Sequence, residues 1–256
     1  MTRERSRRVD AIIIRHQRWG EADRILTVFT RELGKIRIVA KGARKTTSRK
    51  AGHLLPFMRS ALQVSQGRDL WILTQAETIN AYLPLRDDLL RVGNAAYVLE
   101  LLDKFTLEDG PNPLLHRLVF ETLDRLSDDL PAFVVLRFYE LRLLDLMGFR
   151  PQLFQCTVCQ EEIKAQNQFF SAQAGGVVCP SCGIKTADAR RISMVALKYL
   201  RHFQRSSFKE ALAATPGEEV INEVEKIVHW YLTYLLERAI NSQAFMQQIR
   251  TRDAEG

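Results

Sequence analysis

The stretch Lys35-Ile36-Arg37-Ile38-Val39-Ala40-Lys41 alternates between apolar and cationic side chains along most of its length. Successive residues of a β-strand point to opposite faces. One face then carries Ile36, Ile38 and Ala40, and the other carries Lys35, Arg37 and Lys41 with Val39 among them. The pattern predicts a half-buried strand with an apolar inner face and a cationic outer face.

Four further short runs predict strands around this one. They are Val9–Arg15, Ile25–Phe29, Leu62–Ser65 and Leu70–Thr74, the last two joined by Gln66-Gly67-Arg68-Asp69 as a tight hairpin. Five short strands within residues 9–80 predict a small closed barrel of the OB type, which often binds oligonucleotides on one face. An SH3-like barrel gives a similar pattern, and periodicity does not separate the two.

Charge is distributed unevenly along the chain. Residues 1–80 hold 17 lysines and arginines against seven acidic residues, whereas residues 81–256 hold 20 against 23. Like charges crowded onto a small domain repel one another, so such a cluster favours a polyanionic partner, most often a nucleic acid. An anionic membrane surface, an acidic protein and a merely solvated basic face are the alternatives.

The segment Lys41–His53 concentrates this charge, because it has five cations, no acid and two glycines. We interpret it as a mobile basic loop that follows a phosphate backbone, the alternative being a solvated loop. The sequence leaves open whether Arg24 contacts DNA, because Glu21 and Asp23 beside it can pair with it inside the barrel. The predicted DNA-binding surface comprises Arg15, Arg18, Arg24, Lys35, Arg37, Lys41, Arg44, Lys45, Arg49 and Lys50. Polar strand residues such as Gln63 and Thr74 are candidates for lining the same groove.

From Pro84 onward the pattern becomes helical. Residues 85–105 carry an apolar stripe, Asn112 and Pro113 are suited to the N-cap and first residue of the next helix, and another helix is expected from near Pro131 to Met147. A late helix is expected to begin within Thr215-Pro216-Gly217-Glu218, which supplies a cap, a proline as the first helical residue and a capping-box glutamate. The apolar positions of the first stripe are Leu89, Val92, Ala96, Leu99 and Leu102, and those of the last are Val220, Val224, Ile227, Val228, Tyr231 and Leu235. We interpret these stripes as core.

All four cysteines fall in two C-x-x-C pairs, Cys156/Cys159 and Cys179/Cys182, with 19 residues between the pairs. This spacing predicts a four-thiolate zinc site, and four protein ligands leave no open position for a reacting water. One structural Zn2+ is therefore expected, with a short hairpin between the pairs and Gly183 serving the unusual backbone of the second knuckle. A redox-active or free thiol pair is the alternative.

No catalytic motif is evident. The sequence lacks a phosphate-binding glycine loop and an H-E-x-x-H motif, its five histidines are scattered, and its adjacent acids stand at expected helix starts. We expect a protein that is not an enzyme. No apolar run approaches the roughly 20 residues that span a bilayer, and the charged N-terminus is not a secretory signal, so a cytoplasmic location is expected.

The chain resembles the RecO family of bacterial recombination mediators and DNA repair proteins. The resemblance lies in short motifs whose order and spacing are specific and which extend over nearly the whole chain. They are Gly20–Thr27, Gly34-Lys35, Ala40–Lys45, Leu55-Pro56-Phe57, Gly67–Leu70, Gln75-Ala76-Glu77, Tyr139–Leu144, Gly148–Pro151 and the cysteine pairs. Two positions depart from the family pattern. Trp19 stands where a smaller aromatic is commoner, and Gln160 replaces a glycine often seen after the first cysteine pair, which puts the regularity of that knuckle in doubt.

The resemblance implies a multidomain α+β protein with an OB-fold (residues 1–80), a helical domain (81–150 and 189–256) and a zinc finger inserted in it (151–188). It implies a nucleoid-associated, non-catalytic role in recombinational repair. Such proteins bind single- and double-stranded DNA, anneal complementary strands, work with RecR and RecF, contact the acidic tail of the single-strand-binding protein and help load RecA. Some members lack the cysteines.

Two other functional classes fit the residues. A scaffold would dock acidic protein tails on the basic barrel, and an RNA-binding zinc protein would prefer RNA to single-stranded DNA. Competition between tail peptide and DNA, and a comparison of the two nucleic acids, separate these classes.

Overall fold

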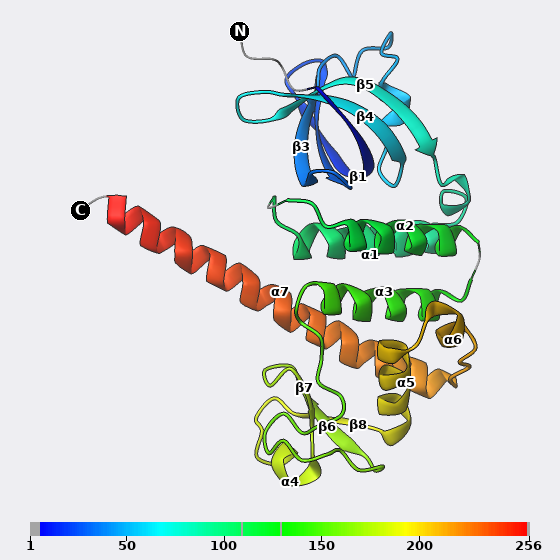
Figure 1. Ribbon diagram of the computed structural model, residues 1–256, viewed down its shortest axis with the longest axis vertical. Helices are drawn as coiled ribbons and strands as arrows, with labels where there is room; N and C mark the ends of the chain where they lie inside the picture. Colours follow the sequence, from blue (N-terminus) through cyan, green and yellow to red (C-terminus); the bar gives the residue numbers. More distant parts are fainter. Residues whose placement is uncertain (1–5, 109, 129, 255–256) are drawn as a thin grey trace. The chain divides into compact units, whose positions relative to one another are not determined.

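The computed structural model describes residues 6–108, 110–128 and 130–254, with side chains of the last helix described through Glu237 (Figure 1). The chain divides into two compact units, residues 1–132 and 133–256. The first holds a β-barrel and two helices, and the second holds the remaining helices and a three-stranded sheet. Among the described residues, no helix is both long and apolar enough to cross a membrane.

The barrel has five strands, β1 (Arg7–Trp19), β2 (Asp23–Thr30), β3 (Gly34–Ala40), β4 (Arg59–Gln66) and β5 (Trp71–Asn80). They close in the order β1-β2-β3-β5-β4, with the β3–β5 pair parallel and the others antiparallel. This is the predicted OB-like barrel. The strands are longer than their apolar runs, because pairing continues through polar residues such as Gln17 and Arg18.

The predicted division of β3 into two faces is confirmed. Ile36, Ile38 and Ala40 belong to the buried core of the barrel, whereas Arg37 is exposed on the other face. β1 pairs with both β2 and β4, and its register with β2 shifts between Ile13 and Arg15. Such a shift bends a strand, which allows β1 to follow the curvature of a closed barrel.

Two helices complete the first unit, α1 (Leu89–Phe105) and α2 (Pro113–Ser127), after a short 3-10 turn η2 (Leu83–Leu85). The predicted cap of α2 is confirmed, because the Asn112 side chain accepts a hydrogen bond from Leu115 N at 3.0 Å. Asp88 caps α1 in the same way, accepting from Arg91 N at 2.9 Å.

The predicted stripe of α1 is only half right. Leu99 and Leu102 are buried, but Leu89 is 86% exposed and Ala96 is exposed. The buried face instead runs through Ala95, Val98, Leu99 and Leu102. Leu89 is the first residue of the helix and lies almost two turns before the first buried position. The predicted stripe therefore began too close to the N-terminus of the helix.

The second unit contains α3 (Ala132–Leu146), β6 (Gln168–Ser171), β7 (Gly176–Val178), α4 (Pro180–Gly183), β8 (Arg190–Ile192), α5 (Met194–Arg205), α6 (Phe208–Leu212) and α7 (Glu218–Ala254). The hairpin expected between the cysteine pairs is β6–β7, and the unpredicted β8 pairs with the other edge of β6. The Phe170 ring lies edge-on to Tyr231 of α7 at 5.5 Å between centroids, which fixes this sheet to the long helix.

The apolar stripe predicted for α7 is largely correct. Val224, Ile227, Val228 and Tyr231 are buried, as is Leu232, whereas Val220 and Leu235 are half-buried. On α3, Arg137 donates to Glu140 at 2.8 Å, and both side chains are almost completely buried.

Candidate nucleic-acid interface and metal centre

The loop that joins β3 to β4 is anchored to the β1–β2 hairpin. Gly42 N donates to Asp23 Oδ1 at 2.7 Å, and Arg44 N donates to Ala22 O at 2.8 Å. The Arg44 guanidinium donates to the carbonyl oxygens of Gly20 at 3.2 Å and Glu21 at 2.9 Å. The loop that was predicted to be mobile is therefore held at this end by hydrogen bonds, and Arg44 is committed to holding it.

Beyond this anchor, the loop and β5 enclose a basic pocket of about 480 Å3. Its lining residues are Lys41, Gly42, Lys45, Thr47, Ser48, Arg49, Lys50, Thr74, Gln75 and Ala76. Thr74 was a sequence candidate for this groove and lines it, whereas Gln63 is not among its lining residues. We call this site the loop pocket.

The cations of the loop pocket are not neutralised. Within the described part of the chain, Lys41, Lys45 and Arg49 have no acidic side chain within ion-pair distance, and Lys50 Nζ donates to Leu73 O at 3.4 Å. The Ser48 hydroxyl is buried and makes no hydrogen bond with the described residues. A buried hydroxyl normally has a hydrogen-bond partner, so Ser48 offers a donor for an anionic ligand. Composition could not reveal this donor, because serine is ordinary in any polar loop.

Arg18 and Arg24 lie directly opposite each other across β1 and β2. Arg24 in turn faces Ala40, the residue before Lys41. The alternative that Arg24 pairs with Asp23 or Glu21 is not found among the described residues. Asp23 accepts from Gly42 N, and the Arg24 Nη1 atom is buried without a hydrogen bond. Like charges opposite each other on adjacent strands destabilise the pair, so an anion is favoured here as well.

Three other predicted residues meet the C-terminal end of α1 instead. Lys35 forms an ion pair with Asp103 and donates to the carbonyl oxygens of Asp103 at 2.6 Å and Thr106 at 3.2 Å. Arg15 Nε also donates to Asp103, at 3.1 Å, and Arg37 pairs with Glu108 at 3.1 Å. We call Arg15, Lys35 and Arg37 the strand cations. The structure does not bring them together with the loop pocket but uses them to hold a helix end.

The contact with the strand cations lowers the pKa of the Asp103 carboxyl group. Burial opposes ionisation of its carboxyl group, but the hydrogen bonds and positive charges of Lys35 and Arg15 outweigh burial and hold the pKa of Asp103 below its ordinary value. Lys35 also satisfies carbonyls at the helix end, where a cation is favoured by the helix dipole. This contact stabilises the packing of α1 against the barrel.

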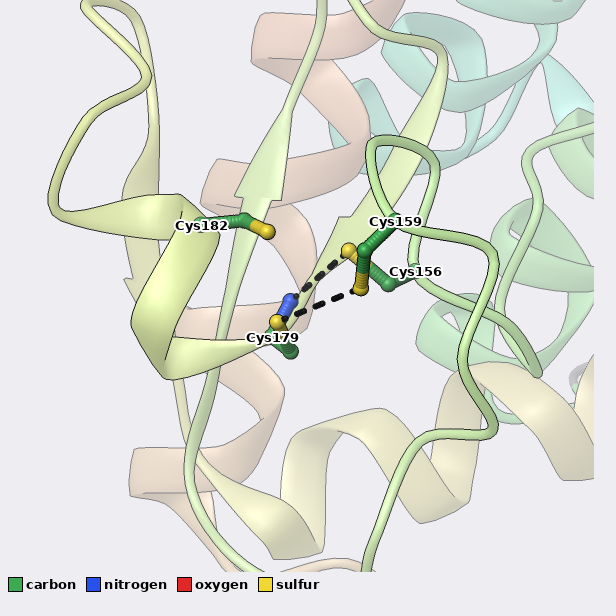
Figure 2. Close-up of side chains that lie close together, drawn as sticks. All are labelled: Cys156, Cys159, Cys179 and Cys182. Carbon is green, nitrogen blue, oxygen red and sulfur yellow. Dashed lines mark hydrogen bonds between the residues drawn. The ribbon is translucent and has the colours of Figure 1, made fainter.

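In the second unit the four cysteines converge (Figure 2). Their sulfur atoms all lie within 4.8 Å of one another, and the Cys159 and Cys179 sulfurs are 3.8 Å apart. A disulfide requires about 2.05 Å. Sulfurs that share a tetrahedral metal at about 2.3 Å stand roughly 3.8 Å apart. Among the described residues, this is the one group of histidine, cysteine and acidic side chains with metal-ligand geometry.

The donor set fits a divalent cation. The Ser181 hydroxyl hydrogen-bonds to Cys179 and, as the largest influence, lowers the pKa of that thiol to about 6. The interaction with Cys179 in turn raises the pKa of Cys182 to about 12. Ionisation of one thiol thus opposes ionisation of another, so four thiolates this close together require a cation between them.

Comparison with known proteins shows the family of the chain. The family model described as Recombination protein O N terminal matches residues 3–82, and the one described as Recombination protein O C terminal matches residues 86–244. The chain belongs to the RecO family. The match covers both units, so the family resemblance seen in the motifs is confirmed, and a role in DNA repair and recombination follows.

Curated relatives support the assignment along the whole chain. A DNA repair protein RecO of Roseiflexus sp. (strain RS-1) is 38% identical over 250 residues, which cover 97% of this chain and 87% of that protein. A DNA repair protein RecO of Dehalococcoides mccartyi (strain ATCC BAA-2100) is 32% identical over 253 residues, covering 99% and 100%. The protein of the same name from Bacillus pumilus is 31% identical over 243 residues, covering 94% of each chain.

Gln160, one of the two positions expected to depart from the family pattern, has a left-handed backbone with φ of 63°. Gln160 N still donates to Cys156 O at 2.9 Å, so the first knuckle closes normally. A non-glycine residue in this conformation costs about 1 kcal/mol, which explains why glycine suits the position.

The prediction for Gly183 needs a different reason. Its backbone lies within the short helix α4 and has no positive φ. Instead, a Cβ atom at Gly183 would stand 2.4 Å from the Phe169 ring. Close approach of α4 to β6, and not an unusual dihedral angle, therefore requires glycine here.

Proposed function

We propose that this RecO-family chain is a DNA-binding protein of recombinational repair that holds DNA strands through the loop pocket. The observation that carries the proposal is the group of cations Lys41, Lys45, Arg49 and Lys50 around one pocket, together with a buried, unpartnered Ser48 hydroxyl. Phosphate groups match both features, since they bring negative charge and hydrogen-bond acceptors. Arg18 and Arg24 extend the basic surface along the β1–β2 hairpin.

Binding through phosphates accounts for the activities that the family resemblance implies. Contacts to the backbone carry no base information, so both single- and double-stranded DNA are expected to bind without sequence preference. A surface that neutralises two strands at once lowers their mutual repulsion and leaves the base edges free to pair. Annealing and assistance in RecA loading follow from this property and need no catalytic group. RecR and the acidic tail of the single-strand-binding protein are the expected protein partners.

The test is binding of labelled, unstructured single-stranded DNA across a salt titration. In the loop variant, Lys41, Lys45, Arg49 and Lys50 are replaced by Ala, and Arg44 is kept because it anchors the loop. Each phosphate contact contributes about −0.7 to the slope of log affinity against log salt, so the variant should flatten the slope by roughly 2 to 3 and lose on the order of 100-fold in affinity at physiological salt.

A control variant removes the same charge from the second unit, at the exposed residues Lys164, Lys185, Lys209 and Lys226. It should keep the wild-type slope. Equal losses in the two variants would mean that only net charge matters, and an unchanged loop variant would eliminate the loop pocket as the DNA site.

We also propose that Cys156, Cys159, Cys179 and Cys182 hold one structural Zn2+. The metal would tie the two knuckles together, and a four-thiolate site leaves no position for substrate. Metal analysis should find one zinc per chain, and Cys156→Ser should lose the metal and lower the thermal midpoint. The control Ser181→Ala removes a hydrogen bond to Cys179 but no ligand, so it should keep the zinc. A purified protein that contains no zinc and is unaffected by Cys156→Ser would refute this site.

A further inference from the structure

Trp19 is the last residue of β1 and stands at the turn of the β1–β2 hairpin. Its side chain is 54% exposed, and it does not belong to the barrel core. Tryptophan is usually well buried, because leaving its large apolar surface in water is unfavourable. Core packing therefore does not explain this residue.

Several contacts connect the hairpin turn that carries Trp19 to the loop pocket. In the β1–β2 register Trp19 lies directly opposite Asp23, and residues in such a pair point to the same side of the sheet. Asp23 accepts the hydrogen bond of Gly42 N, and Gly42 lines the pocket. Arg44 holds the carbonyl oxygens of Gly20 and Glu21, the two residues after Trp19. The hairpin turn and the pocket-forming loop are thus joined at several points.

The charges around the indole suit a nucleic acid. The loop beside the turn supplies two cations: Lys41 adjoins Gly42, and the Arg44 guanidinium donates to the carbonyl oxygens of Gly20 and Glu21, whereas Arg18 points to the face of β1 opposite Trp19. Two acids are also near: Asp23, opposite Trp19, accepts the hydrogen bond of Gly42 N, and Glu21 stands at the turn. An exposed aromatic side chain at the edge of a basic groove is the arrangement with which proteins bind single-stranded nucleic acid, since every base has a face that stacks.

We infer that Trp19 stacks on an unpaired base of a strand whose phosphates occupy the loop pocket. This inference rests on the proposed function and adds a preference to it. In a duplex both faces of each internal base are already stacked, so Trp19 contributes to single-stranded binding and not to double-stranded binding. The hairpin turn thereby discriminates between the two forms of DNA, whereas the loop pocket binds both.

The experiment compares Trp19→Leu and Trp19→Phe with the wild-type protein and the loop variant. Leucine keeps apolar bulk and removes the aromatic face, and phenylalanine keeps a ring. The probes are a labelled poly-dT oligonucleotide and a blunt duplex of the same length, measured by anisotropy at one salt concentration. Trp19→Leu should weaken single-strand binding roughly ten-fold and duplex binding less than about two-fold, and Trp19→Phe should stay within about three-fold of wild type.

Tryptophan fluorescence gives an independent readout. The chain has two other tryptophans, Trp71 and Trp230, so quenching of the wild-type signal by poly-dT that disappears in Trp19→Phe assigns the stacked residue. Unchanged single-strand binding by Trp19→Leu would overturn the inference, as would equal losses for single-stranded and duplex DNA. A loop variant that binds normally would instead overturn the loop pocket and leave the result for Trp19 to stand by itself.

Discussion

The barrel carries two groups of cations that look equivalent in the sequence and differ in the structure. The strand cations, Arg15, Lys35 and Arg37, face the end of α1 and pair with Asp103 or Glu108. Lys41, Lys45 and Arg49 surround the loop pocket, and in the described part of the chain they have no acidic partner. The first group holds the protein together, and the second is left with charge to offer a ligand. A cation is informative about function only when its acidic neighbours are known.

The largest expected effect of this difference is on stability. Lys35→Met removes the charge that faces Asp103 and the α1 carbonyls but keeps an apolar stem. Breaking a fully buried pair costs 3–5 kcal/mol, and the Lys35 and Asp103 side chains retain 13% and 22% exposure, so a loss of about 2 kcal/mol in the free energy of unfolding is expected.

The matched substitution in the loop is Lys45→Met, which should change the unfolding free energy by less than about 0.5 kcal/mol. Urea denaturation followed by circular dichroism measures both. If the two variants were equally stable, Lys35 would not serve the structural role that separates the two groups.

A second effect is the response to acid. The pKa of Asp103 lies below its ordinary value in the folded protein, so its contribution to stability is fully present above the unfolded pKa of about 3.9 and is lost as pH falls through the lower, folded pKa. The unfolding free energy of the wild type should therefore decrease more between pH 5 and pH 3 than that of Asp103→Asn. Parallel curves would show that the strand cations do not stabilise the Asp103 carboxylate.

A smaller effect is expected on the affinity for single-stranded DNA. Asp103→Asn combined with Glu108→Gln releases the strand cations from their acidic partners. Because these cations lie outside the loop pocket, single-strand affinity at physiological salt should rise by no more than about three-fold, through the general change in charge. An increase of ten-fold or more would break the comparison, since it would show that the end of α1 masks a part of the DNA site.

Most local features could be predicted from the sequence, the apolar stripe of α1 excepted, whereas the long-range contacts could not. Alternation in residues 35–41 identified the inner face of β3, Asn112-Pro113 identified the start of α2, and the C-x-x-C spacing brought four thiols together, because each signal lies within a short segment. The partner of Lys35 is Asp103, 68 residues away, and no local pattern connects them. The same holds for Arg44, whose role depends on the carbonyls of the β1–β2 turn. The cations could be found from the sequence, but their division into structural and free groups required the tertiary fold.

The smallest effect on stability is expected for the solvent-exposed ion pair of Arg37, one of the strand cations. Arg37 pairs with Glu108 at 3.1 Å, but the two side chains are 49% and 51% exposed. Solvent-exposed pairs contribute 0 to about 1 kcal/mol, because water and salt screen the charges and the side chains lose freedom. Arg37→Ala should thus lower the unfolding free energy by about 0.5 kcal/mol or less, and 0.5 M salt should remove most of that difference. Single-strand affinity should change less than two-fold. If instead Arg37→Ala weakened DNA binding as strongly as Lys45→Ala while stability was unchanged, Arg37 would belong with the loop pocket, and the boundary between the two groups would run between Lys35 and Arg37 on the same strand.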